Sequence, residues 1–166
     1  KQLSVCPLTT HLPIKKVSKL ISKKLISEKV LLINKFYKTY LGFKPKIAIT
    51  GLNPHCESTS KYNEDEEVIK PSIKKLKKKY LVYGPFSADT IFLKENRKKY
   101  NVILGMYHDQ VLTPIKTLYG FNAINMTLGL PFLRISPDHG PNYEMIGKNK
   151  SDPQSLINAL KFLNRN

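Results

Sequence analysis

The chain has 166 residues and a mass of 19.0 kDa, and its 41% hydrophobic and 24% charged content excludes a wholly disordered protein. No run of about 18 uncharged apolar residues is present, and the start lacks the apolar block of a signal peptide, so we expect neither a membrane span nor secretion. The two cysteines, Cys6 and Cys56, are too few and too far apart in sequence to indicate a disulfide framework. A cytoplasmic location is therefore expected.

The net charge of +16 raises the question of a polyanionic partner. Almost all of the basic residues are lysines, whereas specific phosphate and base recognition favours arginine, which occurs only at positions 97, 134 and 165. No basic motif interleaved with aromatic residues is present. We therefore expect no specific nucleic-acid partner, and we interpret the lysine-rich run at residues 74–79 as the solvated end of a helix.

Short apolar runs alternate with amphipathic stretches along the chain, which is typical of a layered α/β domain. In chain order, the pattern predicts a strand at residues 3–7, a helical stretch from 14 to about 40 with room for one break, a strand at 46–50, a helix at 65–79, a strand at 80–83, a helix at 88–99, strands at 102–106 and 123–128, and a helix at 151–164. The last helix has Ser151 or Asp152 as its cap. It carries an apolar stripe formed by Leu156, Ile157, Leu160 and Leu163.

Polar motifs follow four of the predicted strands, at the edge of an open α/β sheet where ligands usually bind. They are Thr10-His11, Asn53-Pro54-His55, His108-Asp109-Gln110 and the segment at residues 134–139, and together they contain all four histidines of the chain. A single histidine in a loop is most often an ordinary surface residue. Three imidazoles can form an open site for a divalent metal, but none of these histidines lies at i, i+4 spacing, so the sequence alone does not establish ligation.

Several longer motifs occur in a fixed order: THLP at 10–13, GLNPH at 51–55, GPFSADT at 84–90, MYHDQ at 106–110, INMTLGLPFLR at 124–134 and DHG at 138–140. This order resembles the carboxy-terminal half of the 4-hydroxythreonine-4-phosphate dehydrogenase family over essentially the whole chain. The resemblance implies a three-layer α/β/α fold like that of isocitrate and isopropylmalate dehydrogenases, incomplete because the amino-terminal half is absent. Residues 1–166 would form one carboxy-terminal half that carries the metal site and part of the substrate site.

The resemblance also implies a set of metal ligands. They would be His11, His55 and His108, and the family shares its metal site between the two subunits of a homodimer. Zn²⁺ is the expected ion, with Mg²⁺ or Co²⁺ as alternatives. Asp109 follows His108 directly and is interpreted as a carboxylate that orients this histidine, with a turn cap as the alternative. His139 is not assigned to the metal.

The substrate contacts implied by the resemblance are Lys116, Asn125 and Arg134. Lys116 and Arg134 can bind the phosphate and carboxylate of an anionic substrate, although Lys116 taken alone would be interpreted as one more solvated lysine. Asn125 lies inside an apolar run, so we expect a buried amide that needs hydrogen-bond partners. The residue at position 134 is one of only three arginines, which favours a functional cation there.

The activity implied by the resemblance is the oxidation, with decarboxylation, of 4-phosphooxy-L-threonine to 3-amino-2-oxopropyl phosphate in pyridoxal 5'-phosphate synthesis. The hydride acceptor would be NAD or NADP. The chain contains no GxGxxG motif, which agrees with a family whose NAD site is not of the Rossmann type, and the cofactor-binding residues are not identified.

Two departures from the family pattern leave alternatives open. Cys56-Glu57-Ser58 replaces the usual Ala-Gly-Glu, and Pro141-Asn142 replaces the usual Thr-Ala. The alternatives are a related dehydrogenase of 4-phosphoerythronate or phosphothreonate, and an inactive fragment with a basic binding surface. Without the amino-terminal half, we expect weak metal binding and little dehydrogenase activity from this chain alone.

Overall fold

The computed structural model describes residues 3–57, 60, 62–140 and 143–164. The chain forms two compact units, Lys1–Pro114 and Ile115–Asn166, and each unit is described by itself. Of the positions that depart from the family pattern, residues 58, 141 and 142 lie outside the described residues.

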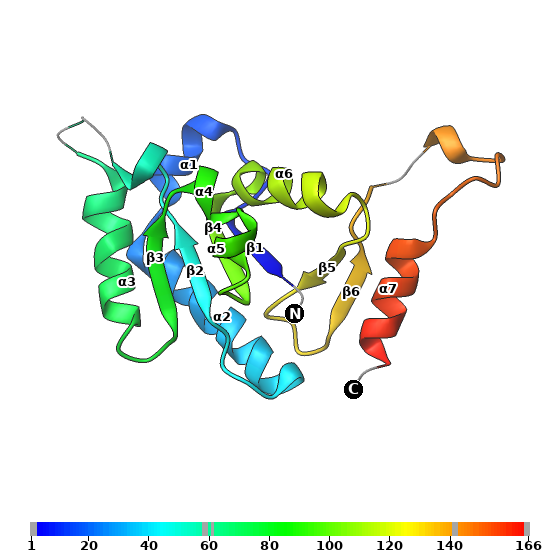
Figure 1. Cartoon of the computed structure of the whole chain (residues 1–166), viewed down its shortest axis with the longest axis horizontal. Coiled ribbons are helices and arrows are strands. Elements are labelled where there is room, and N and C mark those ends of the chain that lie inside the picture. Colours follow the sequence, from blue (N-terminus) through cyan, green and yellow to red (C-terminus); the bar gives the residue numbers. More distant parts are fainter. Residues whose placement is uncertain (1–2, 58–59, 61, 141–142, 165–166) are drawn as a thin grey trace. The chain divides into compact units, whose positions relative to one another are not determined.

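The first unit is built on a four-stranded parallel sheet with the strand order β1-β4-β2-β3 (Figure 1). The strands are β1 (Ser4–Thr9), β2 (Ile47–Thr50), β3 (Val82–Phe86) and β4 (Val102–Tyr107). The two central strands, β2 and β4, are almost entirely apolar and buried, because helices cover both faces of a parallel sheet. All four strands predicted for this part of the chain are confirmed, with ends shifted by a few residues.

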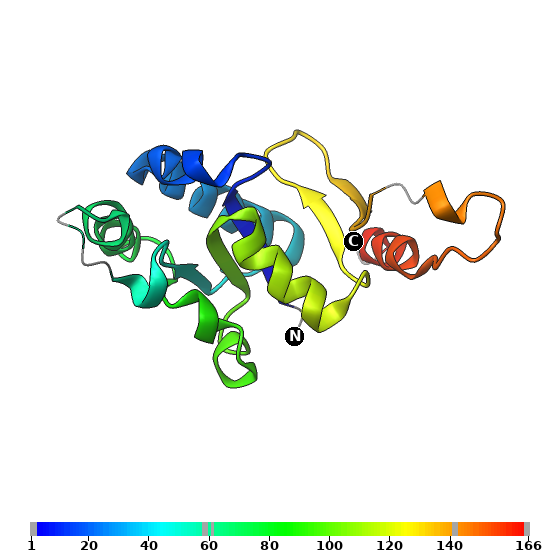
Figure 2. The same ribbon diagram turned by 90° about the horizontal axis from the view of Figure 1, so that it is seen from above.

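Helices form a layer on each side of this sheet (Figure 2). One layer contains α1 (Ile14–Leu20) and α2 (Lys23–Leu41), and α2 packs on α3 (Lys70–Leu76), which continues from the π-helical turn η2 (Asp65–Ile69). The other contains α4 (Ala88–Ile91), α5 (Lys94–Arg97) and the first turns of α6 (His108–Tyr119). The expected α/β class and its three layers are therefore present in this unit.

The break in the first helical stretch lies at Ile21 and Ser22. Ile21 adopts an extended backbone, and the Ser22 Oγ accepts a hydrogen bond of 3.2 Å from the backbone N–H of Leu25, so it caps the new helix α2. The helix buries Ile26 and Val30 completely and ends at Gly42, whose φ of 74° suits a residue without a side chain. Capping by Ser22 explains why one break occurs where the apolar stripe alone would allow a continuous helix.

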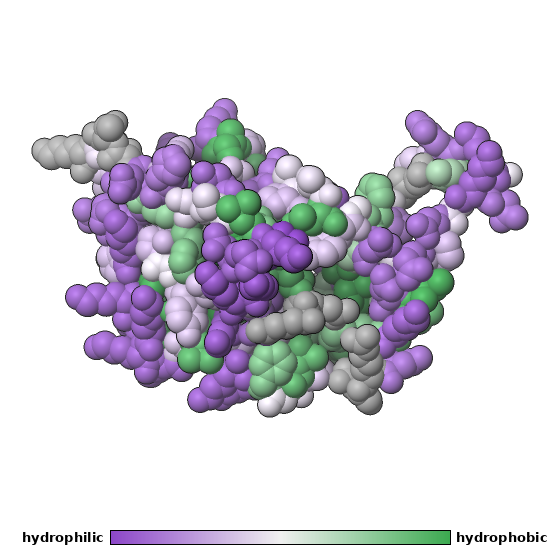
Figure 3. Space-filling model, in the orientation of Figure 1, coloured by the Kyte–Doolittle hydropathy of each residue, from purple (hydrophilic) through white to green (hydrophobic). Residues whose placement is uncertain are grey.

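The lysine-rich run ends α3 in solvent, as the sequence predicts. Lys74, Lys75, Lys77, Lys78 and Lys79 are all exposed. The surface over α3, at the left edge of Figure 3, is correspondingly hydrophilic. Cations at a helix carboxyl end are also favoured by the helix dipole, so these lysines need no binding role to explain them.

The second unit departs from the expectation of one continuous sheet. The strand predicted at residues 123–128 appears as β5 (Ile124–Thr127), but it pairs antiparallel with β6 (Arg134–Pro137), which the sequence did not reveal. The four-residue β6 ends in a proline and follows a loop that is itself apolar, so strand and loop share one pattern. The segment at residues 134–139 therefore does not follow a strand of the parallel sheet.

The predicted last helix is present as α7 (Gln154–Leu163), and its buried face is not the apolar stripe. Ser155 and Ala159 are buried, and the Ser155 Oγ donates a 2.7 Å hydrogen bond to the Ala123 carbonyl beside β5. The apolar stripe of Leu156, Ile157, Leu160 and Leu163 is between 36% and 52% exposed. Small residues allow the helix to approach the hairpin closely, which the periodicity of its apolar residues does not indicate. The cap predicted at Ser151 or Asp152 is not confirmed, because the N-cap is Pro153, although the Asp152 Oδ1 just before it accepts from the Gln154 N–H at 2.8 Å.

A further helix, α6, was not predicted, because Pro114 lies in its interior and proline normally interrupts a helix.

Within the described part of the chain, no helix combines the length and apolar character needed to cross a bilayer.

The helix α2 offers a test of the first unit's core. Replacing Ile26, which is fully buried, with Ala is expected to lower the free energy of unfolding by about 2–5 kcal/mol, because it leaves a cavity against the sheet. The matched control is Leu31→Ala on the same helix, where the side chain is 52% exposed and a change within about 0.5 kcal/mol is expected. Urea unfolding followed by circular dichroism measures both values, and equal losses would contradict the packing of α2 described above.

Candidate metal and substrate site

Three histidines follow the carboxyl ends of three parallel strands that are neighbours in one sheet. His11 lies two residues after β1, His108 directly follows β4, and His55 lies in the turn after β2. Because β4 lies between β1 and β2, His108 starts from the strand between the other two. Adjacent strands are about 4.8 Å apart, so this topology brings residues that are far apart in sequence to one edge.

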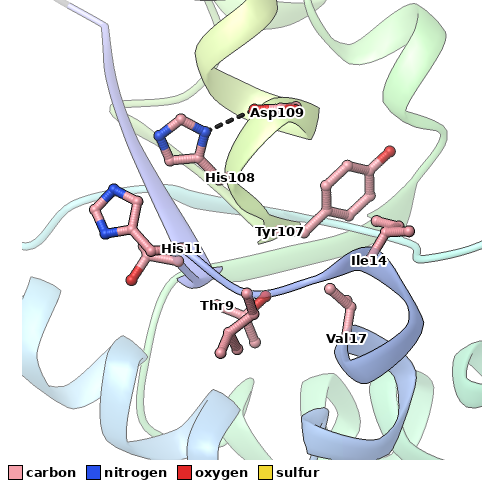
Figure 4. A pocket seen from close by; sticks show the side chains of 9 residues that line it. Thr9, His11, Ile14, Val17, Tyr107, His108 and Asp109 are labelled. Atoms are coloured by element: carbon pink, nitrogen blue, oxygen red, sulfur yellow. Dashed lines mark hydrogen bonds and ion pairs between the residues drawn. The ribbon is translucent and has the colours of Figure 1, made fainter.

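His11 and His108 are close neighbours. Their ring centroids are 5.5 Å apart, and both side chains line a shallow pocket of about 270 Å³ together with Thr9, Tyr107 and Asp109 (Figure 4). The His108 Nδ1 lies 2.7 Å from the Asp109 Oδ1. Since an ionised carboxylate can only accept, the Nδ1 donates in this contact, and the Nε2 is the ring atom that it leaves for another partner. Asp109 thus makes the contact expected of a residue that orients a metal-binding histidine.

His55 lies elsewhere along the edge. It belongs to the 3₁₀ turn η1 (Pro54–Cys56) and lines a second pocket, of about 420 Å³, with Phe86, Ser87 and Lys70 among its walls. In the described residues, no group of three His, Cys, Asp or Glu side chains is arranged to hold a metal ion. A site shared between two subunits does not require three ligands from one chain, so the assignment of His11, His55 and His108 stays a prediction.

The backbone is strained at two of the three candidate ligands. His11 has a φ of 51° and His55 a φ of 55°, and Cys56 follows with a φ of 61°. Left-handed conformations of non-glycine residues cost free energy and persist where the surroundings impose them, frequently at functional sites. Residue types at these positions give no indication of this conformation, so sequence analysis could not have found it.

The loop that carries His55 is fixed by a buried carboxylate. Asp65 is fully buried, and its Oδ1 accepts from the Leu52 N–H at 2.9 Å, while its Oδ2 accepts from Asn53 at 3.0 Å for the backbone N–H and 2.8 Å for the side-chain Nδ2. Gly51 leaves room for this arrangement, since a Cβ there would lie 2.5 Å from the Asp65 Oδ1. The sequence predicted position 65 only as the first residue of a helix, so this role of Asp65 was missed.

Cys56, one of the residues that depart from the family pattern, is buried behind His55. Burial raises the pKa of the Cys56 thiol, an effect that a hydrogen bond with the Gly51 backbone partly opposes. The neutral thiol is a weak nucleophile and a poor metal ligand. Cys56 therefore contributes packing to this loop.

The predicted substrate contacts all lie in the second unit. Asn125 and Thr127 of β5 pair with Ser136 and Arg134 of β6, and residues that pair directly or lie two apart share one face of a hairpin. Asn125 and Arg134 are therefore on the same polar face, where the Arg134 Nη1 donates to the Thr127 Oγ1 at 2.8 Å. Asn125 is exposed, which corrects the expectation of a buried amide: its apolar neighbours Ile124 and Met126 point to the opposite face.

Lys116 is held within the same unit. Its Nζ bonds the Asp138 Oδ2 at 2.8 Å and the Asp138 carbonyl, and it lies 4.7 Å from the centre of the Phe121 ring. The interpretation of Lys116 as one more solvated lysine is therefore wrong. His139, which was not assigned to the metal, lies beside the same phenyl ring, at a centroid distance of 6.5 Å.

Comparison with known proteins supports the resemblance. The family model for the pyridoxal phosphate biosynthetic protein PdxA matches residues 1–163. A 4-hydroxythreonine-4-phosphate dehydrogenase from Sulfurihydrogenibium sp. (strain YO3AOP1) is 46% identical over 166 residues, which are 98% of this chain and 51% of that protein.

Solved structures of the same kind share the fold. A 4-hydroxythreonine-4-phosphate dehydrogenase from Burkholderia phymatum has a TM-score of 0.79 at 33% identity, over 96% of this chain and 49% of that one. The enzyme of that name from Klebsiella pneumoniae has a TM-score of 0.82 at 28% identity, over 98% and 50%. The chain thus spans about half the length of the relatives it matches. Because the family model matches nearly every residue, the chain belongs to the family of the pyridoxal phosphate biosynthetic protein PdxA.

Proposed function

We propose that this chain provides the metal site and part of the substrate site for the NAD-dependent oxidation and decarboxylation of 4-phosphooxy-L-threonine. The observation that carries the proposal is the proximity of His11 and His108 at the carboxyl edge of the parallel sheet, where Asp109 orients His108. The chain that forms this sheet belongs to the family described above. Relatives of about twice the length bear the name of the dehydrogenase, so the complete activity is proposed for an assembly that contains the other half.

The donor set fits a divalent ion. His11 and His108 present two neighbouring imidazoles, and because the His108 Nδ1 bonds Asp109, the His108 Nε2 would be the ligand atom. Nitrogen ligands suit Zn²⁺ in particular, and Co²⁺ is an alternative, whereas Mg²⁺ prefers oxygen. His55 would complete the set in a homodimer that shares its metal between subunits. When bound, the ion supplies a Lewis acid that lowers the pKa of the substrate hydroxyl.

The hairpin of the second unit supplies groups suited to an anionic substrate. Arg134 offers a planar, permanently charged fork for a phosphate or a carboxylate, and Asn125 on the same face offers a donor and an acceptor for a hydroxyl or amine. Lys116 is a second cation, at present neutralised by Asp138. A phosphate that binds Lys116 would exchange with this carboxylate. When bound, NAD would supply the hydride acceptor, and loss of carbon dioxide from the resulting β-keto acid would give 3-amino-2-oxopropyl phosphate.

Replacing His108 with Ala is expected to lower the amount of bound zinc markedly, because it removes the imidazole that Asp109 orients. His55→Ala tests the third proposed ligand in the same way. The matched control is His139→Ala, which removes an exposed histidine that is not a proposed ligand. Metal analysis after dialysis against a fixed concentration of Zn²⁺ gives the result, and unchanged zinc in the His108 and His55 variants would refute the ligand assignment.

The 166-residue chain alone is expected to reduce NAD only slowly with 4-phosphooxy-L-threonine, because it spans half the length of its relatives. The rate is measured from the absorbance of NADH, with 4-phosphoerythronate as a second substrate. Faster reduction with 4-phosphoerythronate would favour the related dehydrogenase, for which the altered residues Cys56 and Glu57 beside His55 provide a reason. Rapid reduction by the isolated chain would show that this half is sufficient.

A further inference from the structure

A line of buried polar groups crosses the carboxyl ends of three strands in the first unit. The Thr9 Oγ1 donates to the Met106 carbonyl at 2.8 Å, and the Met106 N–H donates to the Gln110 Oε1 at 2.7 Å. The Thr50 Oγ1 donates to the same Oε1 at 2.8 Å, and the Gln110 Nε2 donates to the Gly51 carbonyl at 2.8 Å. These hydrogen bonds connect β1 to β4 and β4 to β2 without a gap.

The whole line is shielded from solvent. Thr9, Thr50 and Gln110 are exposed by 6%, 0% and 8%, and the remaining partners are backbone atoms of buried residues. A buried amide without partners costs about 1–3 kcal/mol, so the Gln110 side chain is held in one orientation by the three bonds it makes. Gly105 packs closely against this amide and leaves little room for a side chain, since a Cβ at this position would lie 3.1 Å from the Gln110 Oε1.

Three members of the line lie close in sequence to a proposed metal ligand. Thr9 lies two residues before His11, and Gln110 lies two residues after His108 in the first turn of α6. Gly51 opens the loop that carries His55, the same loop that Asp65 fixes from the other side. A shift of the Gln110 side chain would therefore move these segments relative to one another.

We propose that Gln110, together with Thr9 and Thr50, is a positioning group that fixes His11, His55 and the first turn of α6, which carries His108, relative to one another. The hydrogen bonds that support this proposal do not depend on the proposed function, but the predicted effect on metal binding rests on it. A glutamine suits the position because one amide end accepts twice while the other donates to a carbonyl. A hydrophobic side chain could fill the same space but could not join β4 to β2 at this edge.

The proposal predicts an effect on metal affinity that a purely structural role would not produce. Gln110→Met removes the amide that joins β4 to β2, and Thr50→Val removes one of the three hydrogen bonds of that amide, each with little change in volume. Each variant is expected to weaken Zn²⁺ binding by about 10-fold or more. Thr50→Ser keeps the hydroxyl and should retain the wild-type affinity. The matched control is Ser72→Ala, which removes a buried hydroxyl that bonds the Val68 carbonyl of its own helical segment.

Affinity is measured by competition with a chromophoric zinc chelator, and thermal unfolding is recorded for each variant. If Gln110→Met and Thr50→Val lose stability no more than Ser72→Ala but lose zinc affinity, the positioning role is supported. Wild-type affinity in both variants would overturn it. If Gln110→Met does not fold, the Thr50→Val and Thr50→Ser pair still gives the answer.

A second measurement on the metal-free protein separates this proposal from the proposed function. In Gln110→Met, the backbone amides of Leu52 and Asn53 should exchange with solvent faster, and the ring signals of His55 should shift in the NMR spectrum, although residue 110 is far from them in sequence. Unchanged exchange and unchanged His55 signals would overturn the positioning role. Failure of the wild-type chain to bind zinc would instead refute the metal site and leave this test valid.

Discussion

The direction of the strands in the parallel sheet is the constraint on which the site depends. Parallel strands place all of their carboxyl ends at one edge, so the residues that follow β1, β2 and β4 meet there regardless of their distance in sequence. The order β1-β4-β2 then decides which of them are neighbours: His11 and His108 follow adjacent strands, and their rings are 5.5 Å apart. Both central strands are buried on both faces, which leaves this edge as the place where polar groups can gather.

Buried polar groups beneath this edge fix the positions of the residues that meet there. Asp65 accepts three hydrogen bonds from residues 52 and 53, and Gln110 connects the ends of β2 and β4. Buried polar groups of this kind are costly unless all of their partners are present, so they permit few alternative arrangements. The left-handed backbone at His11 and His55 is consistent with this, because strained conformations persist only where the surroundings determine them.

The sequence predicted the first unit well and the second poorly, for physical reasons. The strands of the parallel sheet are apolar, short and bounded by turn residues, so each was found, and the one break allowed in the first helical stretch lies at Ser22. In the second unit, β6 could not be distinguished from the apolar loop before it. Pro114, at the end of the first unit, concealed α6. The apolar stripe of α7 does not show that the small residues Ser155 and Ala159 form its buried face.

The same contrast applies to the site. The histidines could be identified because motifs of known order surround them, whereas the roles of Asp65, Thr9 and Thr50 arise from hydrogen bonds to distant groups that no local pattern records.

The two cations of the second unit, Arg134 and Lys116, differ in the groups that they contact. The Arg134 guanidinium donates to a neutral hydroxyl, that of Thr127, and no carboxylate among the described residues forms an ion pair with it. Lys116, by contrast, is neutralised by Asp138 and covers the Phe121 ring. In the proposed site, a phosphate that binds Lys116 would displace a carboxylate, whereas the described part of the chain presents no such competitor at Arg134. Because separating an existing ion pair offsets part of the gain from a new one, Arg134 is expected to contribute more to initial anion binding than Lys116. Lys116 would then engage the substrate only after Asp138 has moved away, which makes the ion pair within the unit a determinant of how tightly the anion binds.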